Sequence, residues 1–386
     1  MKKKIAILGS TGSIGKTLIE IIKKDKKNFD VILLTADKNY KELFKQAKIL
    51  NVKNLIITDE KSYLKLKKKI NNKIRIFNNF DSYNNIFSKK IDYVMSSISG
   101  IYGLEPTLKI IKYTKKIAIA NKEAIICGWS VIKKELKKNK TKFIPVDSEH
   151  FSIYYAIKEK NINNLENIYL TASGGPLKNL PLNKFNNIKV TDALNHPNWK
   201  MGKKISIDSA TMMNKVFEII EAHKIFDIPY KKLKILIHPK SYVHALIKFN
   251  DGMIKVVAHD TNMKIPIHNS LYLPKTKFLK TKKIDFNKLN DLDFSYVDYD
   301  KFPLVKIISR LTEKNTLFET IIVAANDELV KKFLQKKISF LDISAKMYKF
   351  LSLNEFKKYK YIKPNSIDKI VKLNNYVRFK INNLSI

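Results

Sequence analysis

The sequence contains little cysteine, little glycine and little arginine, and it has no long hydrophobic run. Cys127 is the only cysteine among 386 residues, so the chain cannot close a disulfide within itself. A lone cysteine is typical of a reducing compartment, and we expect a cytoplasmic protein. No apolar run approaches the roughly 18 residues that a membrane-spanning helix needs, so we expect no membrane partner.

Acidic residues are also few beside basic ones. The chain has 74 Lys+Arg against 35 Asp+Glu, a formal net charge of +39. Such an excess is typical of proteins that bind nucleic acid or anionic membranes. Arginine, which reads phosphates and guanine edges with two parallel hydrogen bonds, occurs only at Arg75, Arg310 and Arg378. We therefore attribute the charge to a compositional bias toward lysine and expect no nucleic-acid partner.

The order of apolar runs indicates the fold class. From Lys4 to about Asp147, short apolar runs alternate with lysine-rich stretches of helical spacing, such as 14–24 and 40–50. This alternation predicts a parallel sheet with helices on both faces. The expected strands are 5–8, 31–34, 54–58, 93–95, 117–120 and 143–146.

The rest of the chain has a different pattern. Its middle mixes expected strands (167–171, 234–238, 244–249 and 253–258) with one strong helix after Ser209. Residues 274–299 are polar and irregular, which suggests a linker. From about Asp300 there is no glycine, and apolar residues recur every three or four positions, as in a helical bundle. The fold class is α/β, with an N-terminal Rossmann-like sheet, an α+β middle and a C-terminal helical bundle.

The glycines are informative because they are scarce. The chain has ten, where about 7% of residues is usual. Gly9, Gly12 and Gly15 follow an apolar strand and open a helix, as in loops that bind a dinucleotide pyrophosphate at a helix N-terminus. A glycine turn without a ligand is one alternative. A phosphate-binding NTPase loop is another, although five residues separate Gly9 from Gly15 where that loop has four.

The type of nucleotide is read at the end of the second expected strand. Asp37 would bind a ribose hydroxyl of NAD, whereas Lys38 would favour the 2′-phosphate of NADP. Both residues are present, so the residue types alone leave the two nucleotides open.

Two carboxylates follow the last expected strand of the sheet. Asp147 and Glu149 would face the same side if the strand continued through them. Paired carboxylates suit Mg²⁺ or Mn²⁺ better than zinc. A solvated acidic turn is the alternative.

The helix expected after Ser209 carries a second polar set. Asp208 or Ser209 is expected to cap it, leaving N–H groups of its first turn for a phosphate. Asn214, Lys215 and Glu218 share one broad face, where the lysine can neutralise a phosphate and the glutamate can supply a third carboxylate. An ordinary polar helix face is the alternative.

A third set lies on two loops. Ser173 is in a glycine turn after an expected strand, and Trp199 lies in a Pro/Gly-flanked loop that could close over a ligand and exclude water. His196 begins that loop, and a histidine beside proline is more often structural than catalytic.

Together these stretches resemble one enzyme family, the 1-deoxy-D-xylulose 5-phosphate reductoisomerases. The resemblance covers nearly the whole chain, in family order. It rests on GSTGSIG (9–15), ANKE (120–123), PVDSEH (145–150), SGGP (173–176), HPNWKMG (196–202), DSATMMNK (208–215), IHP (237–239) and AAND (324–327).

The resemblance implies a division into an NADPH-binding Rossmann-like domain (1–147), a catalytic domain (148–273) with a flap at 196–202, a linker (274–299) and a C-terminal four-helix bundle (300–386). It also implies a homodimer. The implied activity is the NADPH- and divalent-metal-dependent rearrangement and reduction of 1-deoxy-D-xylulose 5-phosphate to 2-C-methyl-D-erythritol 4-phosphate, in the non-mevalonate isoprenoid pathway. The ion would be Mg²⁺, Mn²⁺ or Co²⁺.

Site residues also follow from the resemblance. The implied NADPH contacts are Thr11, Gly12, Ser13, Ile14, Lys38, Asn39, Asn121, Glu123 and Gly202. The implied metal ligands are Asp147, Glu149 and Glu218. Ser173, Ser209, Asn214 and Lys215 would bind the substrate phosphate, and Lys122, Ser148 and His196 would complete the substrate site. Trp199 and Met201 would belong to the flap.

Two residues depart from the family pattern, and one rival function is left. Asp37 and Val216 stand where the family usually has glycine. The first puts a carboxylate beside the expected 2′-phosphate. The rival is a simple NADP-dependent dehydrogenase, which would need neither three metal-binding carboxylates nor a phosphate-binding helix.

Overall fold

The computed structural model describes residues 1–70, 73–157, 162–199 and 201–383. The chain forms two compact units. Unit 1 comprises Met1–Ile125, Val131–Phe151 and Met263–Lys280, and unit 2 comprises Ile126–Ser130, Ser152–Asn262 and Thr281–Ile386. The four-part division into domains stays a prediction.

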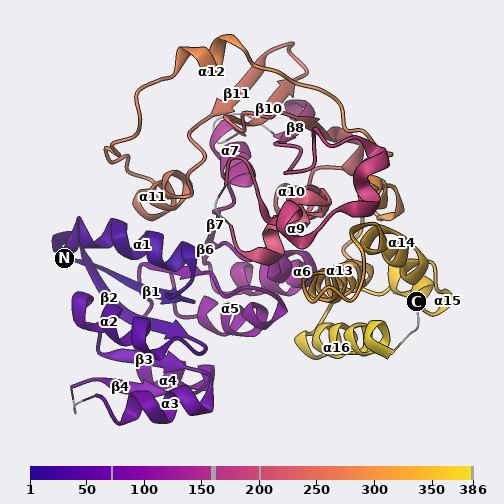
Figure 1. Ribbon diagram of the computed structural model, residues 1–386. Coiled ribbons are helices and arrows are strands. Elements are labelled where there is room, and N and C mark those ends of the chain that lie inside the picture. The colour runs from indigo at the N-terminus through magenta and orange to yellow at the C-terminus, as the bar shows by residue number, and fades with distance from the viewer. Residues whose placement is uncertain (71–72, 158–161, 200, 384–386) are drawn as a thin grey trace. The chain divides into compact units, whose positions relative to one another are not determined.

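A seven-stranded sheet runs through unit 1, and all its paired strands are parallel (Figure 1). The strand order is β4-β3-β2-β1-β5-β6-β7. The chain adds β2 to β4 on one side of β1 and β5 to β7 on the other, so the order of addition reverses between β1 and β5. Open parallel sheets bind ligands at such a point, outside the carboxyl ends of the strands. The strands are β1 (Lys3–Leu8), β2 (Phe29–Ala36), β3 (Asn54–Ile57), β4 (Arg75–Phe77), β5 (Tyr93–Ser96), β6 (Lys116–Ile119) and β7 (Lys142–Pro145).

All six strands expected in this sheet are present, which confirms the parallel α/β prediction. The seventh, β4, was not expected. It has three residues, Arg75–Phe77, between polar stretches, so it forms no apolar run long enough to be recognised.

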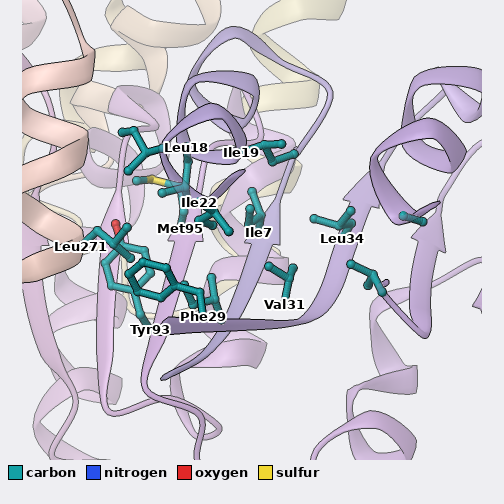
Figure 2. Packing of buried hydrophobic residues seen from close by; sticks show 14 of the residues in the cluster. Ile7, Leu18, Ile19, Ile22, Phe29, Val31, Leu34, Tyr93, Met95 and Leu271 are labelled. Atoms are coloured by element: carbon teal, nitrogen blue, oxygen red, sulfur yellow. The ribbon is translucent and has the colours of Figure 1, made fainter. Parts of the chain in front are cut away.

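Residues of α1 (Ser13–Lys23), α2 (Tyr40–Leu50) and α11 (Lys264–Tyr272) pack in one core with residues of the sheet and cover one of its faces. Leu18 and Ile22 of α1 pack with Ile7 and Met95 of the strands, and Leu271 comes from α11 (Figure 2). The alternate strand residues Ala6, Leu8, Leu33, Val94 and Ile117 are buried as well. Both faces of the sheet are therefore covered, as the strand–helix alternation predicts.

The helix α11 joins unit 1 from far along the chain. Its Tyr272 hydroxyl donates a 2.7 Å hydrogen bond to the buried Asp25 carboxylate. The hydroxyls of Tyr93 and Ser270 lie 2.8 Å apart, which ties the same helix to β5. These polar contacts fix a helix that an apolar core alone would orient less specifically.

Unit 2 contains a four-stranded sheet of order β11-β10-β8-β9. The strand β8 pairs antiparallel with β10 and parallel with β9. Its strands are β8 (Leu165–Ala172), β9 (Leu233–Ile237), β10 (Val243–Phe249) and β11 (Ile254–Ala258). All four expected strands are thereby confirmed, and β11 forms one edge of the sheet.

The end of the chain is helical, as predicted. In Figure 1 the helices α13, α14 and α16 lie together, and α13 packs against both others. The stretch Pro303–Arg310, expected to be helical, is a 3₁₀-helix. Within the described ranges, no helix is long and apolar enough to cross a membrane.

The bounds of the other α-helices are α3 (Glu60–Lys67), α4 (Tyr83–Ile86), α5 (Leu104–Ile111), α6 (Lys122–Lys138), α7 (Ser148–Ile157), α8 (Val190–Leu194), α9 (Lys203–Ala210), α10 (Met213–Phe226), α12 (Phe286–Asn290), α13 (Phe318–Leu334), α14 (Phe340–Leu351), α15 (Asn354–Lys357) and α16 (Ile367–Asn383). Short 3₁₀-helices are η1 (Lys26–Asn28), η2 (Phe80–Ser82), η3 (Ile101–Gly103), η4 (Ile162–Asn164), η5 (Leu182–Asn187), η6 (Tyr230–Lys232), η7 (Pro303–Arg310) and η8 (Lys358–Lys360).

The helix expected to start at Asp208 or Ser209 is in fact two helices. Asp208 and Ser209 lie in the last turn of α9, and α10 begins only at Met213. Between them, Met212 adopts a left-handed backbone conformation with φ +61°. The predicted capping role of Asp208 or Ser209 is therefore wrong, because the chain turns sharply after them.

A chain of alternating charges connects α9 with the C-terminal helices. The amide of Asn326, 0% exposed, donates a 2.7 Å hydrogen bond to Asp208 Oδ1. Lys204 Nζ lies 3.2 Å from the Asp208 carboxylate and 2.9 Å from Asp327, which in turn pairs with Arg378 of α16. A buried carboxylate is tolerated only when it is paired and hydrogen-bonded, so Asp208 depends on these partners.

The first prediction concerns Asn326→Ala. We expect this change to lower the free energy of unfolding by about 2 kcal/mol, since it removes a buried hydrogen bond to a charged group. Urea unfolding followed by circular dichroism measures the loss as a lower midpoint. Asn383→Ala, at an exposed position at the end of α16, is the matched control, and we expect it to shift the stability by less than about 0.5 kcal/mol. Equal midpoints for the two variants would contradict the role given to Asn326.

Candidate active site

The glycine loop of unit 1, residues 9–15, is shaped by two close backbone approaches. Gly9 has φ +76°, a conformation that favours glycine. A Cβ atom on Gly15 would lie 2.6 Å from the carbonyl oxygen of Gly9, so α1 can pack this closely on the turn only with glycine at that position. The loop thus has the form that brings backbone close to a pyrophosphate.

The start of α1 offers hydrogen-bond donors. Its N-cap is Gly12, and no side chain caps the helix. Ser13 and Ile14 form the first turn, and Thr11 precedes them half-buried. The first N–H groups of a helix have no partner within the helix, so an anion can bind them.

The asparagines predicted to contact the nucleotide, Asn39 and Asn121, each hold the backbone of their own segment. Asn39 Oδ1 accepts a 3.2 Å hydrogen bond from Glu42 N–H and so caps α2. Asn121 Oδ1 accepts from Ala124 N–H at 2.9 Å, and its amide donates to the carbonyl of Gly100 at 2.7 Å. Lys38 is exposed at the end of β2, and Glu123 lies in the first turn of α6.

The acidic turn, Asp147 to His150, leads into a helix and does not continue the strand before it. The strand β7 ends at Pro145 and α7 begins at Ser148. Asp147 Oδ1 instead accepts a 3.2 Å hydrogen bond from Glu149 N–H at the start of the helix. The Ser148 hydroxyl donates to Glu149 Oε2 at 2.5 Å. The two carboxylates are therefore related by a helix start and not by the period of a strand.

Asp147 lies among basic groups of its own unit. Its carboxylate forms an ion pair with Lys122 and lies 3.1 Å from Nδ1 of His150. Burial on its own raises the pKa of Asp147, but Lys122 and His150 outweigh it and hold the pKa well below the ordinary value. Asp147 is thus ionised at neutral pH, as a cation ligand must be.

His150 was not predicted as a site residue, although its ring reaches Asp147. The signal was available in the sequence. A histidine three positions after an aspartate falls on the same side of a helix start, and the stretch PVDSEH contains that spacing.

In unit 2, Ser173 and His196 are brought together by hydrogen bonds. Ser173 Oγ lies 3.1 Å from His196 Nε2 and accepts a 3.0 Å hydrogen bond from Gly175 N–H. His196 Nδ1 accepts from the N–H groups of Asn198 at 3.2 Å and Trp199 at 3.0 Å. Because Nδ1 accepts, the imidazole proton resides on Nε2 and is donated to Ser173.

This arrangement orients the serine hydroxyl. Ser173 Oγ accepts from both His196 and Gly175, so its own proton points toward a further acceptor. Burial lowers the pKa of His196 to about 4, which keeps the ring neutral at physiological pH. A neutral His196 can hold Ser173 as a donor to an anionic ligand.

The same turn lies against the end of α9. A Cβ atom on Gly175 would be 2.6 Å from the carbonyl oxygen of Ser209. Gly174 and Gly175 have φ values of +82° and +67°, which suit glycine. Glycine at this turn therefore brings Ser173 and Ser209 into one region of unit 2.

The helix α10 carries the predicted polar set on one face. Asn214 Nδ2 donates a 2.6 Å hydrogen bond to Glu218 Oε1, and Lys215 pairs with Glu218 Oε2. Lys215 is 4% exposed and Glu218 1% exposed. A half-buried amide held together in this way with a buried ammonium and a buried carboxylate has a fixed geometry, which an exposed polar face lacks.

The predicted residues thus fall into two sets. Unit 1 holds Thr11, Gly12, Ser13, Ile14, Lys38, Asn39, Asn121, Lys122, Glu123, Asp147, Ser148 and Glu149, and unit 2 holds Ser173, His196, Gly202, Ser209, Asn214, Lys215 and Glu218. Trp199 stacks edge-on with His244, and Gly202 is the N-cap of α9. Position 200 of the expected flap lies outside the described residues. The glycine loop on a parallel sheet defines a dinucleotide-binding α/β protein.

Family models identify the particular family. The model of 1-deoxy-D-xylulose 5-phosphate reductoisomerase matches residues 5–128. Models of two C-terminal domains of the same enzyme match residues 143–226 and 260–380.

Individual relatives agree with the models. The 1-deoxy-D-xylulose 5-phosphate reductoisomerase of Pelagibacter ubique (strain HTCC1062) is 60% identical over 100% of both chains. That of Clostridium kluyveri is 41% identical over 89% of this chain and 90% of its own length. The chain therefore belongs to the 1-deoxy-D-xylulose 5-phosphate reductoisomerase family.

Solved structures have the same fold. The reductoisomerase from Zymomonas mobilis in complex with NADPH is 33% identical, with a TM-score of 0.89 and 98% of each chain covered. A DOX-P reductoisomerase in complex with NADPH, fosmidomycin and magnesium is 30% identical, with a TM-score of 0.91, over 98% of this chain and 97% of that one.

The second prediction concerns the titration of His196. We expect its ring to titrate near pH 4, against an unfolded value of about 6.5. The stabilising effect of the neutral ring is complete above pH 6.5 and is lost as the pH falls toward 4, because the unfolded chain then binds the extra proton. Proton NMR of the imidazole Cε1–H resonances measures the pKa, and the resonance missing in His196→Gln assigns it. A His196 pKa at or above 6.5 would refute the neutral, Nε2-protonated ring.

Proposed function

We propose that the chain is an NADPH-dependent oxidoreductase and isomerase of the non-mevalonate isoprenoid pathway. It rearranges and reduces 1-deoxy-D-xylulose 5-phosphate, a phosphorylated sugar, to 2-C-methyl-D-erythritol 4-phosphate. The observation that carries this proposal is the 60% identity to the Pelagibacter ubique reductoisomerase over the full length of both chains. The reaction needs a hydride donor and a Lewis acid. The predicted site residues include groups suited to bind a nucleotide, which donates the hydride, and groups suited to bind a divalent ion, which is the Lewis acid.

For the nucleotide, we assign the pyrophosphate to the glycine loop and the start of α1. Thr11, Ser13 and Ile14 offer backbone N–H groups there, and no side chain caps α1. Gly12 shapes the turn, because its own N–H donates to the Gly9 carbonyl at 3.1 Å. Lys38 and Asn39 would contact the adenosine ribose, while Asn121, Glu123 and Gly202 complete the set. Solved relatives in complex with NADPH support the choice of nucleotide.

For the divalent ion, we assign Asp147, Glu149 and Glu218, which are suited to hold one. All three are carboxylates, the hard oxygen ligands that Mg²⁺, Mn²⁺ and Co²⁺ accept. When bound, the ion supplies Lewis-acid polarisation of substrate oxygens. The low pKa of Asp147 supports its role, since the carboxylate needs no deprotonation before it binds a cation.

For the substrate phosphate, we assign Ser173, Ser209, Asn214 and Lys215. Ser173 suits an anion because its hydroxyl proton points away from His196 and Gly175. Lys215 supplies the positive charge, held by Glu218 of the same helix. A phosphate bound by hydroxyls and one ammonium is held by charge-assisted hydrogen bonds.

Lys122, Ser148 and His196 would complete the substrate site. The loop around Trp199 would exclude water during the reaction. The side chain of Asn198 anchors this loop, donating to the carbonyl of Pro239 at 2.6 Å and lying 2.9 Å from Ser241 Oγ. Such closure keeps reactive intermediates from solvent.

The third prediction tests the metal ligands. We expect Glu149→Gln and Glu218→Gln each to lower kcat/KM with Mg²⁺ by at least about a hundredfold, because losing even an outer-shell partner costs up to that much. NADPH oxidation with 1-deoxy-D-xylulose 5-phosphate measures the rate. Mn²⁺ binding, followed by isothermal titration calorimetry, measures the ion directly.

The matched control for that experiment is Glu221→Gln. Glu221 lies on α10 like Glu218 and is equally buried. We expect it to keep Mn²⁺ affinity, and all three variants to keep NADPH binding. Unchanged Mn²⁺ affinity in Glu218→Gln would overturn the assignment.

We further propose that the chain acts in the cytoplasm as a homodimer. The buried, lone Cys127 is consistent with a reducing compartment. The edge strand β11 and the residue before it expose Met253, Ile254 and Val256, at 61%, 55% and 48%. An exposed apolar sheet edge favours pairing with a second copy.

The fourth prediction tests that edge. We expect Ile254→Lys to shift the chain from dimer to monomer in sedimentation velocity, because a lysine on an edge strand opposes pairing. Leu64→Lys is the matched control, since Leu64 is a similarly exposed aliphatic residue on α3 at 50%. A monomeric wild-type chain, or a dimer that survives Ile254→Lys, would exclude this interface.

A further inference from the structure

Asp37 occupies the position at which dinucleotide-binding sheets read the adenosine ribose. It is the first residue after β2, which is the neighbour of β1 in the sheet. The glycine loop is tied to the same strand end: Gly9 N–H donates to Thr35 Oγ1 and Ser10 N–H to the Thr35 carbonyl, both at 2.9 Å. The Asp37 carboxylate therefore follows, by two residues, the point at which β2 contacts the glycine loop.

The carboxylate is held in place by the neighbouring strand. Thr58, the residue after β3, donates its hydroxyl to Asp37 Oδ1 at 2.9 Å. The Asp59 N–H donates to the Asp37 carbonyl at 3.2 Å. Asp37 is exposed but anchored on one oxygen, so a ligand that lies along the end of β2 meets a positioned negative charge.

The nearby cation, Lys38, also interacts with a second acid. Lys38 is the cation expected to attract a 2′-phosphate, but a second acid, Asp59, lies close by. Hydrogen bonds from Ser62 lower the pKa of Asp59, and the charge of Lys38 lowers it further. Asp59 also interacts with Lys61, so Asp37, Lys38, Asp59 and Lys61 have a formal sum of zero, and no arginine, the side chain that accommodates a 2′-phosphate, is among them.

We propose that Asp37 is a specificity-determining residue that accepts a hydrogen bond from the adenosine 2′-hydroxyl of NADH and opposes the 2′-phosphate of NADPH. The chain therefore binds both nucleotides, with dissociation constants within about tenfold of each other, a difference of about 1.4 kcal/mol. This inference rests on the proposed nucleotide site and deepens it. It assigns a function to a carboxylate that departs from the glycine of the family pattern.

Calorimetric titration of the full chain with NADPH and with NADH tests the proposal without any turnover. For Asp37→Asn, which keeps an acceptor for Thr58, we expect NADPH to bind about tenfold more tightly and NADH several-fold more weakly. Lys38→Ala should weaken the binding of NADPH more than that of NADH, because only NADPH carries the 2′-phosphate that the lysine attracts. Asp30→Asn is the matched control: Asp30 is exposed near the opposite end of the same strand, and its removal should change neither affinity.

Each result decides the matter. The proposal is supported if the dissociation constants of NADPH and NADH differ less in the wild-type chain than in Asp37→Asn. A wild-type preference for NADPH of a hundredfold or more, or equal affinities in Asp37→Asn and wild type, overturns it. Failure of the proposed reaction is distinguishable, because it would appear as nucleotide binding without conversion of 1-deoxy-D-xylulose 5-phosphate.

Discussion

The hydrogen bond from Asn326 to the buried carboxylate of Asp208 constrains the part of unit 2 to which we assign the substrate phosphate. Asp208 cannot be buried alone, so α9 must lie where α13 can supply an amide and Lys204 an ammonium group. With α9 fixed, the carbonyl of Ser209 lies against Gly175, and the chain turns through Met212 into α10. The hydrogen bond between Asn326 and Asp208 thus helps to orient Ser209, Asn214 and Lys215, although none of these three residues takes part in it.

Several residues act by orienting others. His196 fixes the serine hydroxyl of Ser173 because two backbone N–H groups occupy its other nitrogen. Asn39 caps α2 and Asn121 caps α6. Sites whose donors are oriented before the ligand arrives avoid the cost of ordering them at the moment of binding. Both units follow this rule.

The sequence was sufficient to predict secondary structure where a local pattern of residue types strongly favours one element. Apolar runs located ten strands, and the spacing from Asn214 to Glu218 predicted a shared helix face because 3.6-residue periodicity is local. It failed where tertiary contacts decide: β4 is too short to show a pattern, and the break at Met212 carries no glycine to indicate it. Asp147 and Glu149 were expected to face the same side if the strand continued, and nothing local in the sequence showed that a helix begins at Ser148 instead. Asn326 belonged to a recognised motif, yet its partner lies 118 residues away.

The return of α11 to unit 1 has a consequence for how the chain is made. Ile267, Leu271 and Tyr272 belong to the same core as residues of β1 and α1, and Asp25 depends on the Tyr272 hydroxyl. During synthesis the first 151 residues can pair their strands, but one part of the sheet face stays uncovered until residue 272 has emerged. The sheet of unit 1 can therefore form before the helix that completes its core has been synthesised. Until α11 packs on it, the growing chain exposes apolar surface that can associate with other chains.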